Sequence, residues 1–175
     1  MDESKLVYIK DAKTKLQEEF VEKYNYPFLL RYAESSLANI DRNFAFATIS
    51  VKKLDDLLKN ETQVQNKEIL DIIPVAKTTR NPFASKIIVG RTSTQDIIIE
   101  DLLVSKFHAY FENLGNNKFS IIERGSTNGT ILNGFKLEVS VQNFVKDQDE
   151  ISFGGIKYVF FSSRSAYNTF KRQNI

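Results

Sequence analysis

The sequence predicts a mainly β fold, an antiparallel β-sandwich that carries an N-terminal α/β extension and a C-terminal helix. Three observations lead to this prediction. From Ile69 onward, β-branched and aromatic residues gather in short runs typical of strands. Clusters rich in Gly, Asn and Asp, which favour tight turns, separate these runs. Helical patterns do not alternate with the runs, which favours an antiparallel sandwich over a parallel α/β sheet.

The N-terminal part has a different pattern. Residues 3–24 carry apolar residues at helical spacing, and Tyr26-Pro27 is expected to end that helix. The inward stripe is Leu6, Ile9, Leu16, Phe20 and Tyr24. β-like runs at 28–32 and 44–50, a helix at 51–58 and a polar connector at 60–67 follow. We expect residues 1–67 to form an extension that packs on the sandwich, and residues 68–175 to form the main domain.

Within residues 68–175, eight strands and one helix are predicted. The expected strands are 69–76, 86–90, 96–99, 109–113, 118–123, 130–132, 150–153 and 157–161, and the helix is 163–172. Turn residues mark the connections, including Asn-Gly at 128–129 and 133–134 and Gly-Gly at 154–155.

Composition and charge exclude several classes of partner. The chain has 175 residues, 42% of them apolar and 26% charged, which suits a globular protein with a proper core. Lys and Arg number 24 and Asp and Glu 22, for a net charge of +2. This balance does not suit a protein that neutralises a run of nucleic-acid phosphates. Because apolar runs fall short of the roughly 20 residues of a membrane span, we expect neither nucleic acid nor a membrane as partner.

Cysteine is absent and His108 is the single histidine. No disulfide, thiolate nucleophile or multi-histidine metal site can therefore form. Asp147, Asp149 and Glu150 lack the 12-residue ligand pattern of a calcium loop and are interpreted as a solvated turn. We expect no metal and no cofactor. The missing cysteine and the polar start, which lacks a signal-peptide pattern, predict a cytoplasmic protein.

Small polar and charged residues cluster at three predicted strand ends. They are the segments Gly90-Arg91, Ser105-Lys106-Phe107-His108 and Gly125-Ser126-Thr127-Asn128-Gly129. An arginine fork, hydroxyl groups and an asparagine amide, brought together by loops, suit a doubly charged tetrahedral oxyanion. A phosphate group on a side chain is such an anion.

The order and spacing of four motifs resemble the forkhead-associated (FHA) domain, a β-sandwich module that binds phosphothreonine in partner proteins. The motifs are GR at 90–91, SKFHA at 105–109, GSTNGT at 125–130 with LNG at 132–134, and DQDEISFG at 147–154. The resemblance covers about residues 69–161. It implies a non-enzymatic adaptor in Ser/Thr kinase signalling, whose partners are a protein or peptide containing phosphothreonine and an upstream Ser/Thr kinase.

The resemblance also implies a role for each site residue. Arg91 matches the arginine that pairs with the phosphate, and Ser105 the serine whose hydroxyl donates to it. Lys106 stands where the family presents a backbone N–H or a basic side chain. Thr127 matches a residue of the phosphate site or pocket wall, and Asn128 matches the asparagine that holds the peptide main chain.

Other matched positions support the architecture of the site without contacting the ligand. These positions are Gly90, His108, Gly125 and Gly129. Two residues depart from the family pattern: Glu123 stands where Asp is common, and Gln148 where a turn Gly is common. Neither belongs to the ligand set, so the site is expected to be competent.

Three alternative interpretations remain open at this point. The chain could be a structural interaction domain that uses its sheet faces or its N-terminal extension independently of phosphate. It could be an enzyme with a dyad of Ser105 and His108, although one histidine and the lack of an evident orienting acid make that remote. Arg91 could be a surface arginine that pairs with Asp96 or Asp101.

Overall fold

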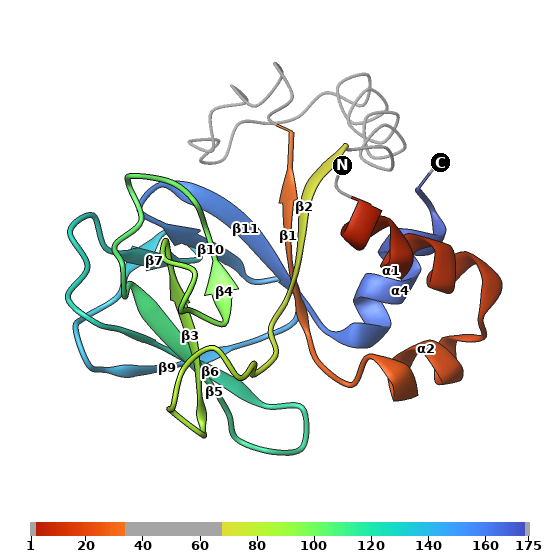
Figure 1. The fold of residues 1–175 in the computed structure, drawn as a ribbon, viewed down its shortest axis with the longest axis horizontal. Coiled ribbons are helices and arrows are strands. Elements are labelled where there is room, and N and C mark those ends of the chain that lie inside the picture. Colours follow the sequence, from red (N-terminus) through yellow and green to blue (C-terminus); the bar gives the residue numbers. More distant parts are fainter. Residues whose placement is uncertain (1–2, 34–67, 174–175) are drawn as a thin grey trace, which may run out of the picture.

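The computed structural model describes residues 3–33 and 68–173, which form two packed β-sheets with helices beside one of them (Figure 1). In spatial order, the first sheet consists of β2 (Ile69–Pro74), β1 (Phe28–Tyr32), β11 (Ile156–Phe161), β10 (Glu150–Phe153), β7 (Thr130–Leu132) and β8 (Phe135–Lys136). The second consists of β4 (Ile97–Ile98), β3 (Lys86–Gly90), β5 (Ala109–Asn113), β6 (Phe119–Glu123) and β9 (Gln142–Val145). The predicted mainly β sandwich is confirmed.

The core lies between the two sheets. Phe111 of β5 meets two aromatic residues of the opposite sheet, Phe153 and Phe160, with ring centroids 6.4 and 6.0 Å apart. All three side chains are buried in one cluster that draws on both sheets. Because side chains alternate between the faces of a strand, each sheet can fill this core with every second residue.

Strand pairing is antiparallel among the described strands except where β3 meets β4. Five strands, β1, β3, β5, β7 and β10, have the predicted bounds, and four others differ only at their ends. β8 and β9 were missed, because exposed Phe135 and Phe144 break the alternation that marks a half-buried strand. The elements predicted at 44–50, 51–58 and 60–67 lie outside the described residues.

The single helix predicted over 3–24 is wrong, because the chain forms two helices. α1 spans Glu3–Thr14 and α2 spans Gln17–Lys23. Leu16 between them is extended (φ −68°, ψ 157°), and its N–H donates to the Glu19 carboxylate at 3.1 Å. The turn redirects the chain, so Leu16 is 67% exposed instead of facing inward. None of the described helices has the length and apolarity to cross a membrane.

The described part of the N-terminal segment is built into the first sheet. β1 lies between β2 and β11 and pairs with both. The helices α1, α2 and α4 (Ser163–Lys171) gather beside β1 and β2 (Figure 1). Aromatic rings join them, with Phe20 and Tyr167 5.4 Å apart and Phe28 and Phe170 5.5 Å apart. The division into domains at residue 67 stays a prediction.

Candidate functional site

The three polar segments emerge at one end of the second sheet. Ala109 of β5 pairs with Val89 of β3 on one side and with Glu123 of β6 on the other. Because these pairings are antiparallel, β3 and β6 end where β5 begins, at the same end of the sheet. The loops at 91–96, 99–108 and 124–129 therefore meet there, as the sequence predicts.

Gly90 permits the first two loops to touch. A Cβ atom at this position would lie 2.1 Å from the Lys106 carbonyl oxygen, so no residue with a side chain fits without moving the backbone. Directly after it, the Arg91 N–H donates to the Ser105 carbonyl oxygen at 3.1 Å. The two residues expected to bind phosphate are thus fixed next to each other through their backbones.

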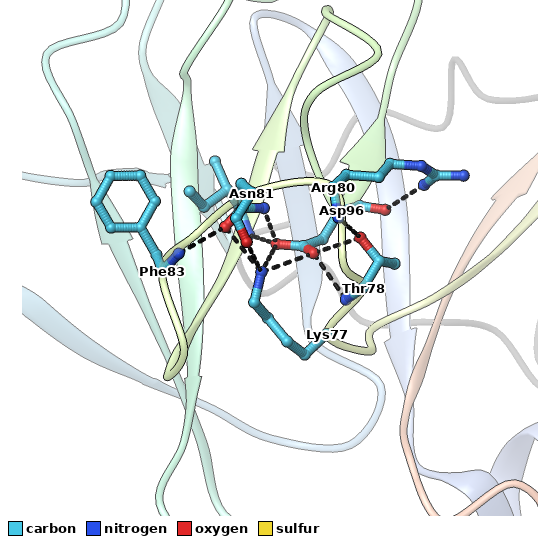
Figure 2. A network of polar contacts seen from close by, with 7 residues as sticks. Lys77, Thr78, Arg80, Asn81, Phe83 and Asp96 are labelled. Carbon is cyan, nitrogen blue, oxygen red and sulfur yellow. Dashed lines mark hydrogen bonds and ion pairs between the residues drawn. The ribbon is translucent and has the colours of Figure 1, made fainter.

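Buried Asp96 does not pair with Arg91. Its carboxylate accepts hydrogen bonds from the Lys77 ammonium, the Thr78 hydroxyl and the Asn81 amide at 2.7 to 3.0 Å, as Figure 2 shows, and from the Ile88 N–H at 2.8 Å. Burial acts to raise the pKa of Asp96, but these donors outweigh it and lower the pKa to about 2. The Asp96 network ties the 77–81 turn to strand β3, which leaves Arg91 outside it.

The Arg91 guanidinium is partly exposed and, among the described residues, takes part in no hydrogen bond or ion pair. The other proposed partner, Asp101, instead accepts the Leu103 N–H at 2.8 Å. Neither Asp96 nor Asp101 pairs with Arg91, so the structure does not support the interpretation of Arg91 as a structural ion-pair residue. A guanidinium without a carboxylate can bind an external anion.

Ser105, Thr127 and Asn128 lie together where the second and third loops meet. The Thr127 N–H donates to the Ser105 hydroxyl oxygen at 3.0 Å, and the two hydroxyl oxygens are 3.4 Å apart. The Asn128 amide donates to the Leu103 carbonyl oxygen at 2.9 Å. Asn128 thus fastens the two loops, a contact beyond the peptide-holding role expected from the resemblance.

Lys106 presents an exposed side chain beside this junction, while its backbone is held in place. Its carbonyl oxygen accepts the side-chain amide of Gln95 at 2.9 Å. Gln95 is buried and also donates to the Thr92 hydroxyl at 3.0 Å. Sequence reasoning missed Gln95, because a glutamine in a polar loop carries no pattern that distinguishes a buried amide from a solvated one.

His108 connects the second and third loops from beneath. Its ring is fully buried, and Nδ1 accepts the Ser105 backbone N–H at 3.1 Å. Nε2 lies 3.1 Å from both the Gly129 carbonyl oxygen and the Ser126 hydroxyl oxygen. An accepting Nδ1 places the proton of the neutral ring on Nε2, and burial lowers the pKa of His108, which favours that neutral form. The ring contacts the backbone of Ser105 instead of its hydroxyl, so the nucleophile dyad is not formed.

Glu123 and Ser126 complete the support of the third loop. Buried Glu123 accepts the Thr130 hydroxyl and the Ser126 N–H, and the Ser126 hydroxyl in turn accepts the Gly129 N–H at 3.0 Å. Burial acts to raise the pKa of Glu123, but these hydrogen bonds outweigh it and lower the pKa. From the sequence, Glu123 was noted only as a departure from the family pattern. Its hydrogen bonds depend on the three-dimensional arrangement of the loop.

Glycine is required within the third loop for backbone reasons. Gly125 and Gly129 have φ angles of 76° and 82°, in the left-handed region where side chains are strained.

The whole arrangement offers a cationic fork, hydroxyl groups and exposed loop backbone to an anion. Among the described residues, no cluster of three His, Asp or Glu side chains is placed to hold a metal ion.

Comparisons with known proteins give matches over part of the chain. Residues 87–154 match the family model of the FHA domain. The glycogen accumulation regulator GarA of Mycobacterium tuberculosis is 36% identical over 73 residues, which are 42% of this chain and 43% of GarA. The oxoglutarate dehydrogenase inhibitor of Corynebacterium efficiens is 32% identical over 77 residues, which are 44% of this chain and 51% of that protein. The chain thus spans about half the length of the curated relatives that it matches.

Among solved structures, the N-terminal FHA domain of Saccharomyces cerevisiae Rad53p, determined with a phosphothreonine peptide, is similar to this chain. The TM-score is 0.44 and the sequence identity 22%. The similarity covers 53% of this chain and 85% of that one.

Proposed function

Because residues 87–154 form a forkhead-associated domain, we propose that the chain is a phosphothreonine-dependent adaptor module in Ser/Thr kinase signalling. FHA domains belong to the modules that recognise phosphorylated motifs with basic side chains. One observation carries the proposal: the Arg91 guanidinium lacks a partner among the described residues, at the junction that also presents Ser105 and Thr127.

The proposed mechanism is electrostatic capture of the phosphate. A phosphothreonine carries a charge of about −1.5 to −2 near pH 7 and offers three acceptor oxygens. Arg91, the Ser105 hydroxyl and nearby backbone N–H groups replace its hydration shell, and Lys106 and Thr127 flank it. The methyl group of threonine adds an apolar contact that serine lacks, so phosphothreonine is preferred over phosphoserine.

A regulatory role in the cell follows from the same proposal. GarA and the oxoglutarate dehydrogenase inhibitor are named as a regulator and an inhibitor, which supports a binding protein over a catalyst. The partner is a protein that a Ser/Thr kinase has phosphorylated on threonine. Binding then depends on the kinase, and the chain itself carries out no reaction.

Titration calorimetry with matched phosphothreonine, phosphoserine and unmodified peptide libraries tests the function. We expect binding of the phosphothreonine library and a loss of at least tenfold to a hundredfold in Arg91→Ala, because a hydrogen bond to a charged group contributes about 1.5 to 3 kcal/mol. Ser105→Ala should lose less, since the principal charge remains. Arg172→Ala, at an exposed position after α4, is the matched control. Equal binding of modified and unmodified peptides would disprove the proposal, and undiminished binding by Arg91→Ala would disprove the site.

A further inference from the structure

A second candidate surface lies between the helices and the edge of the second sheet. It is a groove of about 810 Å³, and the apolar residues that line it include Val21, Tyr26, Pro27, Phe119, Phe144 and Phe160. Phe119 and Phe160 are buried members of the sandwich core, so the floor of the groove is rigid. Phe144 is 64% exposed at its rim. This far end groove therefore combines a fixed apolar floor with an accessible aromatic ring.

The far end groove is separated from the phosphate site by the length of the sandwich. β5 begins at Ala109 and β6 ends at Glu123, both beside the candidate site. At the other end of these two strands, Asn113 pairs with Phe119. Phe119 and the adjoining Lys118 line the groove. A strand of five residues spans roughly 15 Å, so one small ligand cannot contact both places.

Charge around the groove favours an acidic ligand. Lys118, Lys146 and Arg164 line it, and within the described residues neither lysine takes part in an ion pair. The Arg164 guanidinium donates to the neutral Gln17 side chain at 2.7 Å. Asp147 is the acidic residue of the lining, and its two oxygens already accept the Ser162 N–H and the Ser165 hydroxyl, each at 2.6 Å. The cations are therefore left for an outside partner.

Two further features favour a peptide. β9 is the edge strand of its sheet and, within the described part of the chain, pairs only with β6. An open strand edge can receive an extended segment. Ser163 also lines the groove, and its hydroxyl is buried without a hydrogen-bond partner among the described residues.

We propose that the far end groove binds an extended peptide segment of a partner protein in which an apolar residue is flanked by acidic residues, independently of phosphate. The apolar residue packs on Phe119 and beside Phe144. The acidic residues face Lys118 and Lys146. This surface goes beyond the proposed phosphothreonine recognition, because it does not use Arg91.

Fluorescence anisotropy of a labelled peptide with one Phe between pairs of Glu tests the proposal. The full chain should bind it, and added salt should weaken binding because exposed charges are screened. Replacing the Glu residues with Lys, or the Phe with Ala, should lower affinity at least tenfold. Amide resonances of residues 118, 144 and 146 should shift during an NMR titration.

Variants of the protein locate the binding. Phe144→Ala should weaken the peptide at least tenfold, and the double variant Lys118→Glu, Lys146→Glu should abolish binding. Phe135→Ala, which removes a 78% exposed ring on β8, and Lys10→Glu, on an exposed position of α1, are the matched controls and should bind normally. Arg91→Ala should keep this binding while it loses the phosphopeptide.

The outcomes separate the two sites. If the chain does not bind the acidic peptide, if the Lys-containing peptide binds equally well, or if Phe144→Ala has no effect, the proposal is overturned. If the acidic peptide instead shifts residues near Arg91 and fails to bind Arg91→Ala, it mimics phosphate at the first site, and the groove is again not the receptor. None of these results changes the conclusion on phosphothreonine binding.

Discussion

His108 is a buried side chain that joins two loops of the candidate site from beneath. Its ring joins the backbone of Ser105 to the Gly129 carbonyl and the Ser126 hydroxyl. Both loops that are proposed to contact the phosphate therefore depend on a neutral imidazole beneath them. We expect its contribution to affinity to be positional and that of Arg91 to be electrostatic.

His108→Ala should accordingly lower stability and phosphopeptide affinity together. The substitution removes three polar contacts of a fully buried ring and leaves donors and acceptors unsatisfied, at a cost of about 2 to 4 kcal/mol. Thermal unfolding followed by circular dichroism and titration calorimetry measure the two effects. A normal melting temperature with selective loss of binding would instead make His108 a ligand contact.

Asp96 predicts a defined pH dependence of stability. Its folded-state pKa of about 2 lies below the ordinary value of 3.8, so the carboxylate stabilises the fold above pH 4 and loses that contribution as the pH falls toward 2. The contribution is about 2 kcal/mol. Urea unfolding between pH 7 and pH 2.5 measures the free energy of unfolding of the wild type and of Asp96→Asn. The gap, which is the difference between these two free energies, should narrow below pH 4. A gap that stays constant would contradict this assignment.

At the scale of elements, the helices are held by aromatic packing more than by their own propensity. Phe20 of α2 is fully buried and meets Tyr24, Phe28, Tyr167 and Phe170 with centroid distances of 4.8 to 6.5 Å. α2 has only seven residues, too few to be stable alone in water. Its position therefore depends on the ring cluster that joins α2, β1 and α4.

Phe20→Ala and Leu16→Ala form a matched pair, because the sequence pattern placed both residues on the inward stripe. Phe20→Ala should lower the free energy of unfolding by about 3 to 5 kcal/mol through cavity formation. Leu16→Ala should change it by less than about 0.5 kcal/mol, since that side chain is largely exposed. Chemical denaturation measures both. Similar losses in the two variants would mean that α1 and α2 pack differently.

Strands that are mostly buried could be predicted from the sequence, and strands that are mostly exposed could not. β3 and β5 carry nearly continuous apolar runs between turn residues, so their bounds were predictable. β9 has only Val145 buried, and β8 has no buried residue, so burial left no pattern in them. The break at Leu16 depends on a backbone turn within an otherwise helical stripe, which periodicity alone does not reveal.

The candidate site divides in the same way. The placement of Arg91, Ser105 and Asn128 on neighbouring loops was predictable, because the three residues belong to motifs in the loops between predicted strands. The buried contacts of Gln95 and the bond from Asn128 to the Leu103 carbonyl depend on how loops cross in space. Pairwise contacts between loops leave little trace in a single sequence.

For the whole molecule, the most consequential feature is the interior position of β1 in the first sheet. Its neighbour β2 is reached through the segment outside the described residues, and its other neighbour β11 lies near the far end of the chain. β2 contacts the rest of its sheet through β1. We therefore expect the candidate site and the helical layer to unfold together.

Removal of residues 1–33 should consequently disrupt more than the N-terminal layer. The deletion takes β1 from between β2 and β11 and exposes strand edges and an apolar helix face, so we expect aggregation or loss of the cooperative unfolding transition. Size-exclusion chromatography and thermal unfolding measure this. A monomeric fragment with the wild-type melting temperature would show that the sandwich folds without residues 1–33.

The same pairing has a consequence for the time at which the fold forms during synthesis. Phe28 of β1 pairs with Phe161 of β11, so the first described strand meets the last described strand. At roughly 5 to 20 residues per second, the ribosome needs roughly 7 to 27 seconds to translate the stretch between them. During that interval β1 lacks one of its two neighbours, and its apolar side chains remain available to chaperones. The first sheet can therefore close only after the segment that carries β11 has been translated.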